Sequence, residues 1–230
     1  MSIEGASSVR TETQQGRPNV VQPLPPQGER SVGVHGAPGE LSLPARQPGF
    51  RGTLPWGLVR AVRPRQWVKN GLVLAAPLVS GRILEGDVLA DTAVAFVLFC
   101  AVASAVYLIN DSLDVAEDRR HPVKRLRPIA AGLVPRALAL TLAAVLIVAA
   151  LAVAVLLTRP QLAWVLGVYV AVQLAYCLAL KHQPVIDLAI VSSGFLLRAV
   201  AGGVAAGIPL SQWFLLVAAF GSLFLSLIHI

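Results

Sequence analysis

Long apolar runs fill most of the chain beyond Trp56. A helix that crosses the hydrocarbon core of a membrane needs about 20 apolar residues, and several runs reach that length. The first run is shorter, and a turn-like Gly207-Ile208-Pro209 divides the last long stretch in two. The pattern predicts an all-α, polytopic transmembrane bundle with about six spans, at residues 67–84, 92–110, 137–158, 160–180, 188–207 and 210–230.

Basic and acidic residues are sorted between the connections that join these spans. Cytoplasmic connections of membrane proteins are enriched in Lys and Arg. The segment before the first span, the loop after the second and Lys181-His182 after the fourth are basic, whereas Glu85, Asp87 and Asp91 precede the second. Every basic connection falls on one side when six spans alternate. We therefore predict a multi-pass protein of the cell's inner (plasma) membrane with a cytoplasmic N-terminus.

The N-terminal segment has a different composition from the rest of the chain. It holds seven of the sixteen prolines, with many Gly, Ser and Gln residues and no apolar periodicity. Such a segment buries too little apolar surface to offset the entropy lost on ordering. It also lacks the apolar core of a secretion signal. We predict a disordered cytoplasmic tail at residues 1–52 and a transmembrane domain of catalytic type at residues 53–230.

The overall composition agrees with a membrane protein. The chain is 56% hydrophobic and 13% charged, and a soluble domain carries about twice that charged fraction. The net charge of +7 is explained by basic cytoplasmic loops, so nucleic-acid binding is not expected. Cys100 and Cys177 lie inside apolar runs and are interpreted as small apolar residues rather than as a disulfide. Assembly into a homo-oligomer is left open.

A group of acids follows the second predicted span. At about 100° per residue, Tyr107, Asp111, Asp114 and Asp118 fall on one narrow helical stripe, with Asn110 beside it. Stacked carboxylates repel one another, and a divalent cation removes that repulsion. Carboxylate and amide oxygens are ligands that Mg²⁺ prefers. The stripe predicts a Mg²⁺ site, although a solvated helix end neutralised by nearby arginines is an alternative.

Basic residues crowd the loop that follows the acids, among them Lys124, Arg127 and Arg136. Inside-positive topology alone accounts for this charge. A diphosphate ligand, however, requires both acids that hold a metal and cations that contact phosphate oxygens. Both interpretations fit the loop.

The fifth predicted span opens on a second polar group. Pro184 suits a helix start, and Asp187 would fall in the first turn, where an acid also simply complements the helix dipole. Arg198 lies eleven residues beyond Asp187, about 16 Å along a straight helix. Because it cannot easily reach either surface, we expect Arg198 to pair internally or to line a wet cavity. Gly203 and Gly207 have the spacing of close helix packing.

Three separated blocks carry a resemblance to a known family. Asn110-Asp-x-x-Asp114-x-x-x-Asp118 and Tyr176…Lys181…Asp187 resemble the UbiA-type membrane prenyltransferase superfamily. The sequence is most similar to the decaprenyl-phosphate phosphoribosyltransferase branch of this superfamily in three blocks: Arg63-Pro-Arg-Gln-Trp-Val-Lys69-Asn70, residues 121–132 and residues 180–187. Members have nine spans around a central cavity. The chain ends near a sixth span, so a C-terminally truncated member is expected.

The resemblance implies a Mg²⁺-dependent reaction. 5-Phosphoribose would pass from phosphoribosyl diphosphate to a polyprenyl (decaprenyl) phosphate lipid, with release of pyrophosphate, in the synthesis of cell-wall arabinan precursors. Positioning and charge neutralisation would supply most of the catalysis. The residues implied are Asn110, Asp114 and Asp118 for the metal, Asp111, Asp114 and Asp187 for catalysis, and Lys69, Tyr107, Lys124, Arg127, Arg136, Tyr176, Lys181 and Arg198 for substrate binding.

Two alternatives remain open. A UbiA-type enzyme could instead transfer a prenyl group from its diphosphate to an aromatic acceptor with the same use of metal. A transporter or a non-catalytic membrane subunit is an alternative of another class. A transporter would carry ionisable groups through the depth of the membrane.

Overall fold

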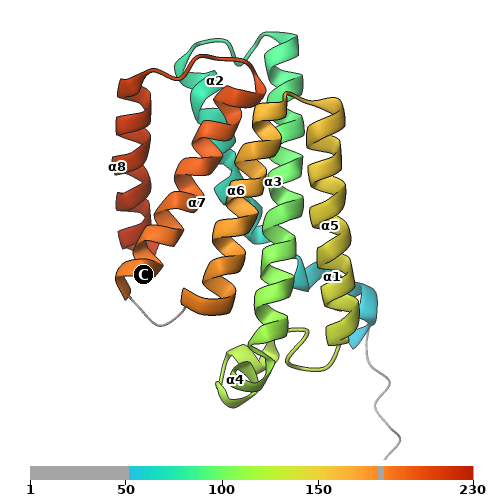
Figure 1. Cartoon of the computed structure of the whole chain (residues 1–230). Helices are drawn as coiled ribbons and strands as arrows, with labels where there is room; N and C mark the ends of the chain where they lie inside the picture. The colour runs from blue at the N-terminus through green and yellow to red at the C-terminus, as the bar shows by residue number, and fades with distance from the viewer. Residues whose placement is uncertain (1–51, 181–183, 230) are drawn as a thin grey trace, which may run out of the picture. The chain divides into compact units, whose positions relative to one another are not determined.

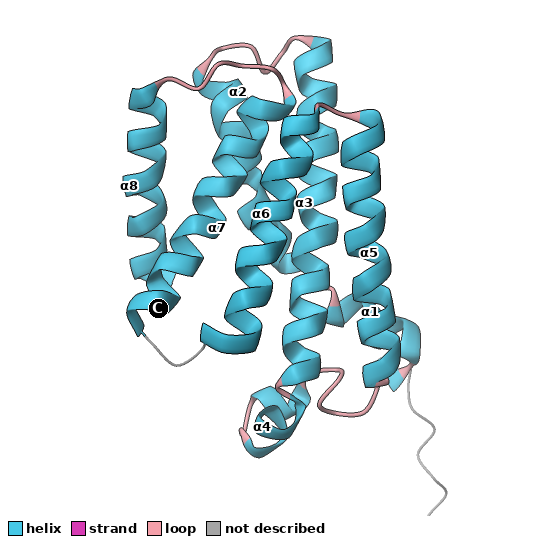
Figure 2. Ribbon diagram, in the orientation of Figure 1, coloured by secondary structure: helices cyan, strands magenta, loops and turns pink. Residues whose placement is uncertain are grey.

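The computed structural model describes residues 52–180 and 184–229, all of which belong to the compact unit Arg46–Ile230. The predicted tail at residues 1–52 therefore lies almost wholly outside the described residues. These residues form helices, turns and loops without a strand (Figure 2). The helices are α1 (Leu54–Ala61), η2 (Pro64–Leu74), α2 (Ala75–Val79), α3 (Gly86–Leu113), α4 (Val115–Arg120), η3 (Lys124–Leu126), α5 (Arg136–Leu157), α6 (Pro160–Ala175), η4 (Tyr176–Leu180), α7 (Pro184–Ala205) and α8 (Gln212–His229).

The all-helical, polytopic class predicted from the sequence is confirmed. Among the described residues, four helices are long and apolar enough to cross a membrane: α3, α5, α6 with the start of η4, and α7. The shorter α8 is also apolar. The predicted spans at 92–110, 137–158, 160–180, 188–207 and 210–230 each correspond to one of these helices. The predicted count of six is approximate.

The first predicted span differs from the expectation of a single α-helix. Residues 64–74 form the 3₁₀-helix η2, and the short α2 continues it to Val79. At ~2.0 Å per residue for a 3₁₀-helix and ~1.5 Å for an α-helix, the two together extend about 30 Å, close to the thickness of the hydrocarbon core. η2 packs closely on α7. The space between them is too small for a side chain at Gly202 of α7, since a Cβ atom there would overlap the carbonyl of Val73 in η2.

The central helix of the bundle is α3. Its buried residues include Ala95, Phe99, Val102 and Val106, which pack in one apolar cluster with residues of α5, α6 and α7. A second cluster joins α3 and α5 to α1 through Ala61. Because α3 is covered on several sides, polar side chains near its end are held by neighbouring elements rather than by solvent.

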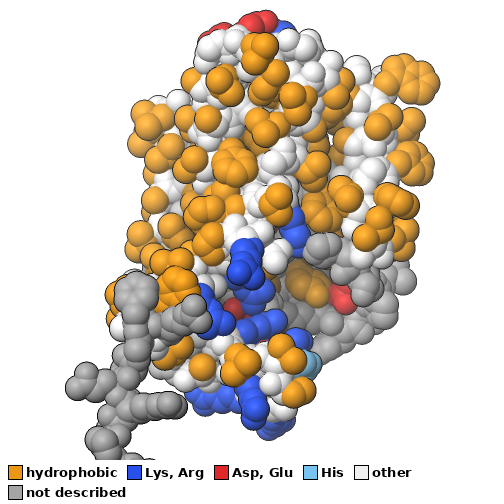
Figure 3. All heavy atoms as spheres, turned by 180° about the vertical axis from the view of Figure 1, so that it is seen from behind, with side chains coloured by type: hydrophobic (Ala, Val, Ile, Leu, Met, Phe, Trp, Pro, Cys, Tyr) orange, Lys and Arg blue, Asp and Glu red, His pale blue; other side chains and the backbone are white. Residues whose placement is uncertain are grey.

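The bundle has a polar end and an opposite end. α1 and α4 lie at one end of the long helices, and α2 and the connections that lead into α3, α6 and α8 lie at the other (Figure 1). We call the first the polar end. Lys and Arg side chains gather there, while apolar side chains cover most of the face above it (Figure 3). The basic segment before η2 and the basic loop after α4 thus lie at one end, and the acidic connection before α3 lies at the other, as predicted. The predicted basic connection at Lys181 and His182 lies outside the described residues.

The opposite end carries an exposed ion pair. Arg82 donates to both carboxylate oxygens of Glu85, and the Nη2–Oε2 distance is 2.6 Å. These hydrogen bonds lower the pKa of the Glu85 carboxyl. Both side chains are over 40% exposed, so solvent screens the attraction and little stability is expected from it.

Candidate active site

The acids of the polar end do not lie on one helix. α3 ends at Leu113, and Asp114 adopts φ −89° and ψ 7° between α3 and α4. α4 turns away from the axis of α3 (Figure 1). The prediction of a single stripe through Tyr107, Asp111, Asp114 and Asp118 is therefore wrong at its last residue. The chain bends at Asp114, and Asp118 comes from a different helix.

The bend brings Asp118 and Asp111 to the same guanidinium. Nη1 of Arg127 lies 2.8 Å and 3.0 Å from the two Asp118 oxygens and 3.1 Å from Oδ1 of Asp111. Nη2 of Arg63 lies 2.6 Å and 2.8 Å from the two Asp111 oxygens. We call these four residues the Arg127 cluster. Both acids are about 2% exposed, so the arginines neutralise carboxylates that are almost out of contact with solvent.

Arg63 is held in place by an unusual backbone conformation. It is the non-glycine residue with a positive φ among the described residues, at φ 53° and ψ 61°. A left-handed conformation costs a non-glycine residue about 1–2 kcal/mol. The guanidinium carbon lies 4.7 Å from the ring centroid of Tyr107, in addition to its contacts with Asp111. Ion pairing and cation–π contact offset the backbone cost.

A second set of polar side chains meets on another side of the end of α3. Asn110 donates from Nδ2 to Oδ2 of Asp114 at 3.1 Å, and the Cys177 thiol lies 3.5 Å from Oδ1 of Asn110. Tyr176, beside Cys177, hydrogen-bonds to Asp187 and lies within electrostatic reach of Asp114. We call Asn110, Asp114 and Asp187 the Asp114 group.

One oxygen of the Asp114 group has an unsatisfied position. Oδ1 of Asp187 is buried and has no hydrogen-bond partner among the described residues. A buried carboxylate oxygen without a donor costs free energy unless a ligand supplies one. α7 begins at Pro184 and Asp187 lies in its first turn, as predicted. A cation or a hydrogen-bond donor of a bound ligand would satisfy Oδ1 of Asp187.

A cavity of about 180 Å³ lies inside the bundle. Lys69 from η2, Tyr107 from α3 and Arg198 from α7 all line it, and no carboxylate is among its lining residues. Its remaining lining residues are Ala103, Val106, Tyr169, Gln173, Val191, Gly194 and Phe195. The cavity therefore offers positive charge and hydrogen-bond donors at a site that begins about one helical turn from Asn110 and Asp111.

Arg198 is bound within the bundle, as expected from its depth. Nε donates to Oδ1 of Asn70 at 2.7 Å, and Nη2 donates to the Tyr169 hydroxyl at 2.9 Å. Nη1 donates to the Gly194 carbonyl at 2.6 Å. Arg198 is 7% exposed, and its guanidinium also stacks on Tyr169. The prediction of internal pairing beside a cavity is confirmed.

The remaining predicted site residues are dispersed. Lys124 and Arg136 are exposed on η3 and at the start of α5. Tyr176 is half-buried in η4. Lys181 lies outside the described residues. The structure thus brings together Lys69, Tyr107 and Arg198, whereas Arg127 joins the acids. Cys100 and Cys177 are not joined by a disulfide, as expected.

A comparison with known protein families identifies a family whose membrane architecture agrees with this fold. The UbiA prenyltransferase family matches residues 72–230, which is most of the chain and includes both groups of acids. The chain belongs to the UbiA prenyltransferase family. Members of this family are polytopic membrane proteins, in agreement with the four apolar helices of this chain.

Similar proteins within the UbiA family have been named for one reaction. The chain is 63% identical over 174 residues to decaprenyl-phosphate phosphoribosyltransferase from Mycolicibacterium smegmatis. It is 59% and 60% identical over 173 residues to the proteins of that name from Corynebacterium glutamicum and Mycobacterium tuberculosis. Each match covers 74% of this chain but 54%, 52% and 57% of the respective relatives. The chain therefore spans about half the length of these relatives.

Three residues that build the site were not among the predicted site residues. Arg63 and Asn70 belong to a block that carries the family resemblance, and Tyr169 lies in an apolar run, but no site role was predicted for any of the three. A buried arginine requires acceptors, so the polar residues within the predicted spans were the available signal for Asn70 and Tyr169. The contact of Arg63 with Asp111 depends on a left-handed residue before a proline, which residue spacing does not reveal.

Proposed function

We propose that the protein transfers 5-phosphoribose from phosphoribosyl diphosphate to a polyprenyl phosphate at the cytoplasmic side of the plasma membrane. The observation that carries the proposal is the separation of charges at the polar end. Lys69 and Arg198 line a cavity without a carboxylate. Asn110 and Asp114 of the Asp114 group follow Tyr107 at the end of the central helix α3. Two anionic substrates need such a cationic space beside oxygen ligands. The names of the relatives described above support this choice.

The reaction requires little covalent chemistry from the protein. The bond between ribose C1 and the diphosphate oxygen breaks, and an oxygen of the lipid phosphate forms the new bond to C1. Pyrophosphate leaves with the bonding electrons. Since the acceptor phosphate is already anionic, no strong general base is needed. The residues hold two anions together and stabilise the charge of the leaving group.

The Asp114 group fits a Mg²⁺ ion that arrives with the substrate. Mg²⁺ is commonly bound by one or two carboxylates together with substrate phosphates and water. No group of three His, Cys, Asp or Glu side chains in the described part of the chain lies close enough to hold a metal alone. Asn110, Asp114 and Asp187 would hold the ion, and the buried Asp187 oxygen supports this assignment. When bound, Mg²⁺ would neutralise the diphosphate.

The other charged residues take different roles in this proposal. Asp118 and Asp111 keep Arg63 and Arg127 in place. Both carboxylate oxygens of Asp118 accept hydrogen bonds from Arg127. A role for Asp118 as a metal ligand stays a prediction. Lys69 and Arg198 would contact phosphate oxygens in the cavity. Lys124, Arg136 and Lys181 are candidates for an incoming diphosphate at the membrane surface.

Product detection tests the proposed reaction. Membranes that contain the chain are supplied with phosphoribosyl diphosphate, decaprenyl phosphate and Mg²⁺, and lipids are analysed by mass spectrometry. A new lipid with the mass of decaprenyl phosphate plus phosphoribose is expected. Parallel membranes receive a prenyl diphosphate and an aromatic acid. A prenylated aromatic product there, without a phosphoribosyl lipid in the first sample, favours the aromatic prenyltransferase and contradicts the proposal.

A further inference from the structure

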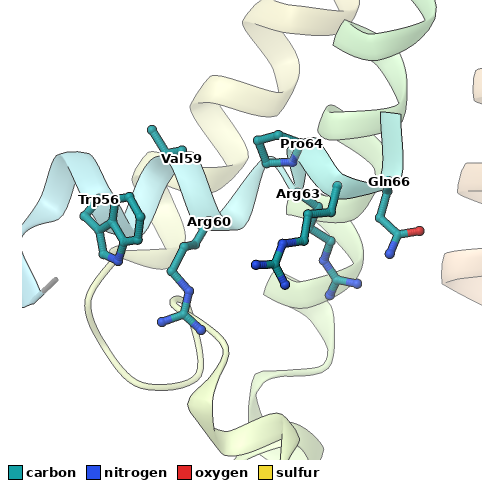
Figure 4. A pocket seen from close by; sticks show the side chains of 7 residues that line it. Trp56, Val59, Arg60, Arg63, Pro64 and Gln66 are labelled. Atoms are coloured by element: carbon teal, nitrogen blue, oxygen red, sulfur yellow. The ribbon is translucent and has the colours of Figure 1, made fainter. Parts of the chain in front are cut away.

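A wide hollow opens at the polar end, separate from the inner cavity. It has a volume of about 740 Å³ and is formed by α1, the start of η2 and the residues between them. Trp56 and Val59 contribute apolar surface, and Arg60, Arg63 and Arg65 contribute charge. Arg60 and Arg63 extend to the same side, with Trp56 next to Arg60 (Figure 4). The proposed reaction assigns no substrate to this hollow.

The charge of the hollow is not balanced by its own lining. Three arginines line it and no carboxylate does. Arg63 is bound to Asp111, whereas Arg60 and Arg65 are exposed and form no ion pair with a described carboxylate. Like charges held close together raise the free energy of the unliganded state, and an anion lowers it. A phosphate oxygen is a good match, since the fork of guanidinium donors binds phosphate in a bidentate manner.

The apolar part of the hollow selects a lipid over a free anion. α1 packs on the bundle through Gly57 and Ala61, and a side chain at Gly57 would meet Val134 at 3.0 Å. Its remaining surface carries Val59, which is 50% exposed, and Trp56. A helix at the end of a bundle with Trp, aliphatic and Arg residues outward has the composition of an interfacial helix. Free phosphate would use the arginines and leave this apolar surface without a role.

We propose that this hollow binds the phosphate head group of an anionic glycerophospholipid of the surrounding membrane. Arg60 and Arg65 contact the phosphate, Trp56 and Val59 contact the glycerol and upper acyl region, and α1 lies in the membrane interface. The bound lipid also covers Arg63, so it holds the residue that orients Asp111. The inference does not depend on the proposed transfer reaction.

Quenching of Trp56 by brominated lipids tests the proposal. The full chain is placed in nanodiscs with brominated phosphatidylglycerol or, at the same mole fraction, brominated phosphatidylcholine. The signal of Trp56 is the difference between the native chain and Trp56→Phe. Preferential quenching by phosphatidylglycerol is expected. Arg60→Gln and Arg65→Gln should each reduce that preference about fivefold, which corresponds to about 1 kcal/mol per basic residue near a membrane surface.

Arg120→Gln is the matched control, because Arg120 is an exposed arginine of α4 at the same end but outside the hollow. It should leave the lipid preference unchanged. Melting temperatures of the variants establish that they fold, since Arg60, Arg65 and Arg120 are all exposed. Equal quenching by the two lipids overturns the proposal, as does an equal loss in Arg120→Gln. Loss of the preference on addition of millimolar inorganic phosphate assigns the hollow to a free anion and also overturns it.

Discussion

Two sets of acids lie within a few residues of each other at the end of α3 and have different surroundings. In the Arg127 cluster, Asp111 and Asp118 are buried and accept hydrogen bonds from Arg63 and Arg127. In the Asp114 group, the contacts between described residues include an amide, a thiol and a phenol, and one buried oxygen of Asp187 has no donor among the described residues. The bend at Asp114 separates the two sets.

The different surroundings of the two sets of acids indicate different roles, one in stability and one in ligand binding. A buried carboxylate with fixed guanidinium partners is costly to disturb, because removal of one partner leaves the other charge unpaired. A buried oxygen that lacks a donor favours a ligand that supplies one. We therefore propose that the Arg127 cluster chiefly maintains the architecture of the polar end and that the Asp114 group binds Mg²⁺ and phosphate.

The largest expected effect follows from removal of the shared guanidinium. Arg127→Met leaves Asp118 without its ion-pair partner in a site that is 2% exposed. A loss of about 3–5 kcal/mol in the free energy of unfolding is expected. Denaturant unfolding in detergent measures it, with Arg120→Met as the exposed control. A loss below about 1 kcal/mol, equal to that of the control, would contradict the structural role of the cluster.

A smaller effect is expected where a buried arginine has neutral partners. Asn70→Leu removes the acceptor that lies 2.7 Å from Nε of Arg198. Since a hydrogen bond to a charged group contributes about 1.5–3 kcal/mol, the free energy of unfolding should fall by about that amount. The same unfolding experiment measures it. Double replacement, Asn70→Leu with Arg198→Leu, should recover part of the loss; a double variant that is less stable than either single one would argue against a coupled pair.

The Asp114 group should show the reverse behaviour. Asp187→Asn keeps the volume and removes a carboxylate whose Oδ1 has no donor among the described residues. The free energy of unfolding should change by less than about 1 kcal/mol or rise slightly. Affinity for phosphoribosyl diphosphate in Mg²⁺ should fall at least tenfold, or about 1.4 kcal/mol. Titration calorimetry and melting together check this, and marked destabilisation with unchanged affinity would place Asp187 with the architectural residues.

The smallest effect is expected at the opposite end. The pKa of Glu85 is lowered by its hydrogen bonds from Arg82, so the pair contributes above the unfolded-state pKa and is lost as the pH falls through the folded-state pKa. Because Glu85 is highly exposed, this contribution should not be measurable. The melting temperature of Glu85→Gln should follow that of the native chain from neutral to mildly acidic pH. A difference that grows as the pH rises would show that this pair contributes more than expected.

Much of the architecture could be predicted from the sequence, because long apolar runs and basic loops are direct consequences of the membrane as solvent. The helices near residues 92–110, 137–158 and 160–180 were predicted within a few residues, apart from the earlier start of α3. The 3₁₀ form of η2 was not, and neither was its close approach to Gly202, which lies far away in the sequence.

The candidate site could be predicted in composition but not in arrangement. The acids and Arg127 were identified, and the depth of Arg198 correctly implied internal partners. The bend at Asp114 could not be predicted, because α-helical spacing continues smoothly through it in the sequence. Because the backbone changes direction at Asp114, Asp118 contacts the guanidinium of Arg127 instead of sharing a helical stripe with Asp114.

The proposed function requires the Asp114 group to bind Mg²⁺ together with phosphoribosyl diphosphate. This requirement can be checked by isothermal titration of the native chain and of Asp114→Asn with phosphoribosyl diphosphate, in Mg²⁺ and in EDTA. We expect binding by the native chain in Mg²⁺, and at least tenfold weaker binding in EDTA or in Asp114→Asn. Melting temperature should be nearly unchanged in the variant, since an asparagine oxygen can still accept from Asn110. Equal affinity in EDTA, or in Asp114→Asn, would contradict Mg²⁺ binding by the Asp114 group.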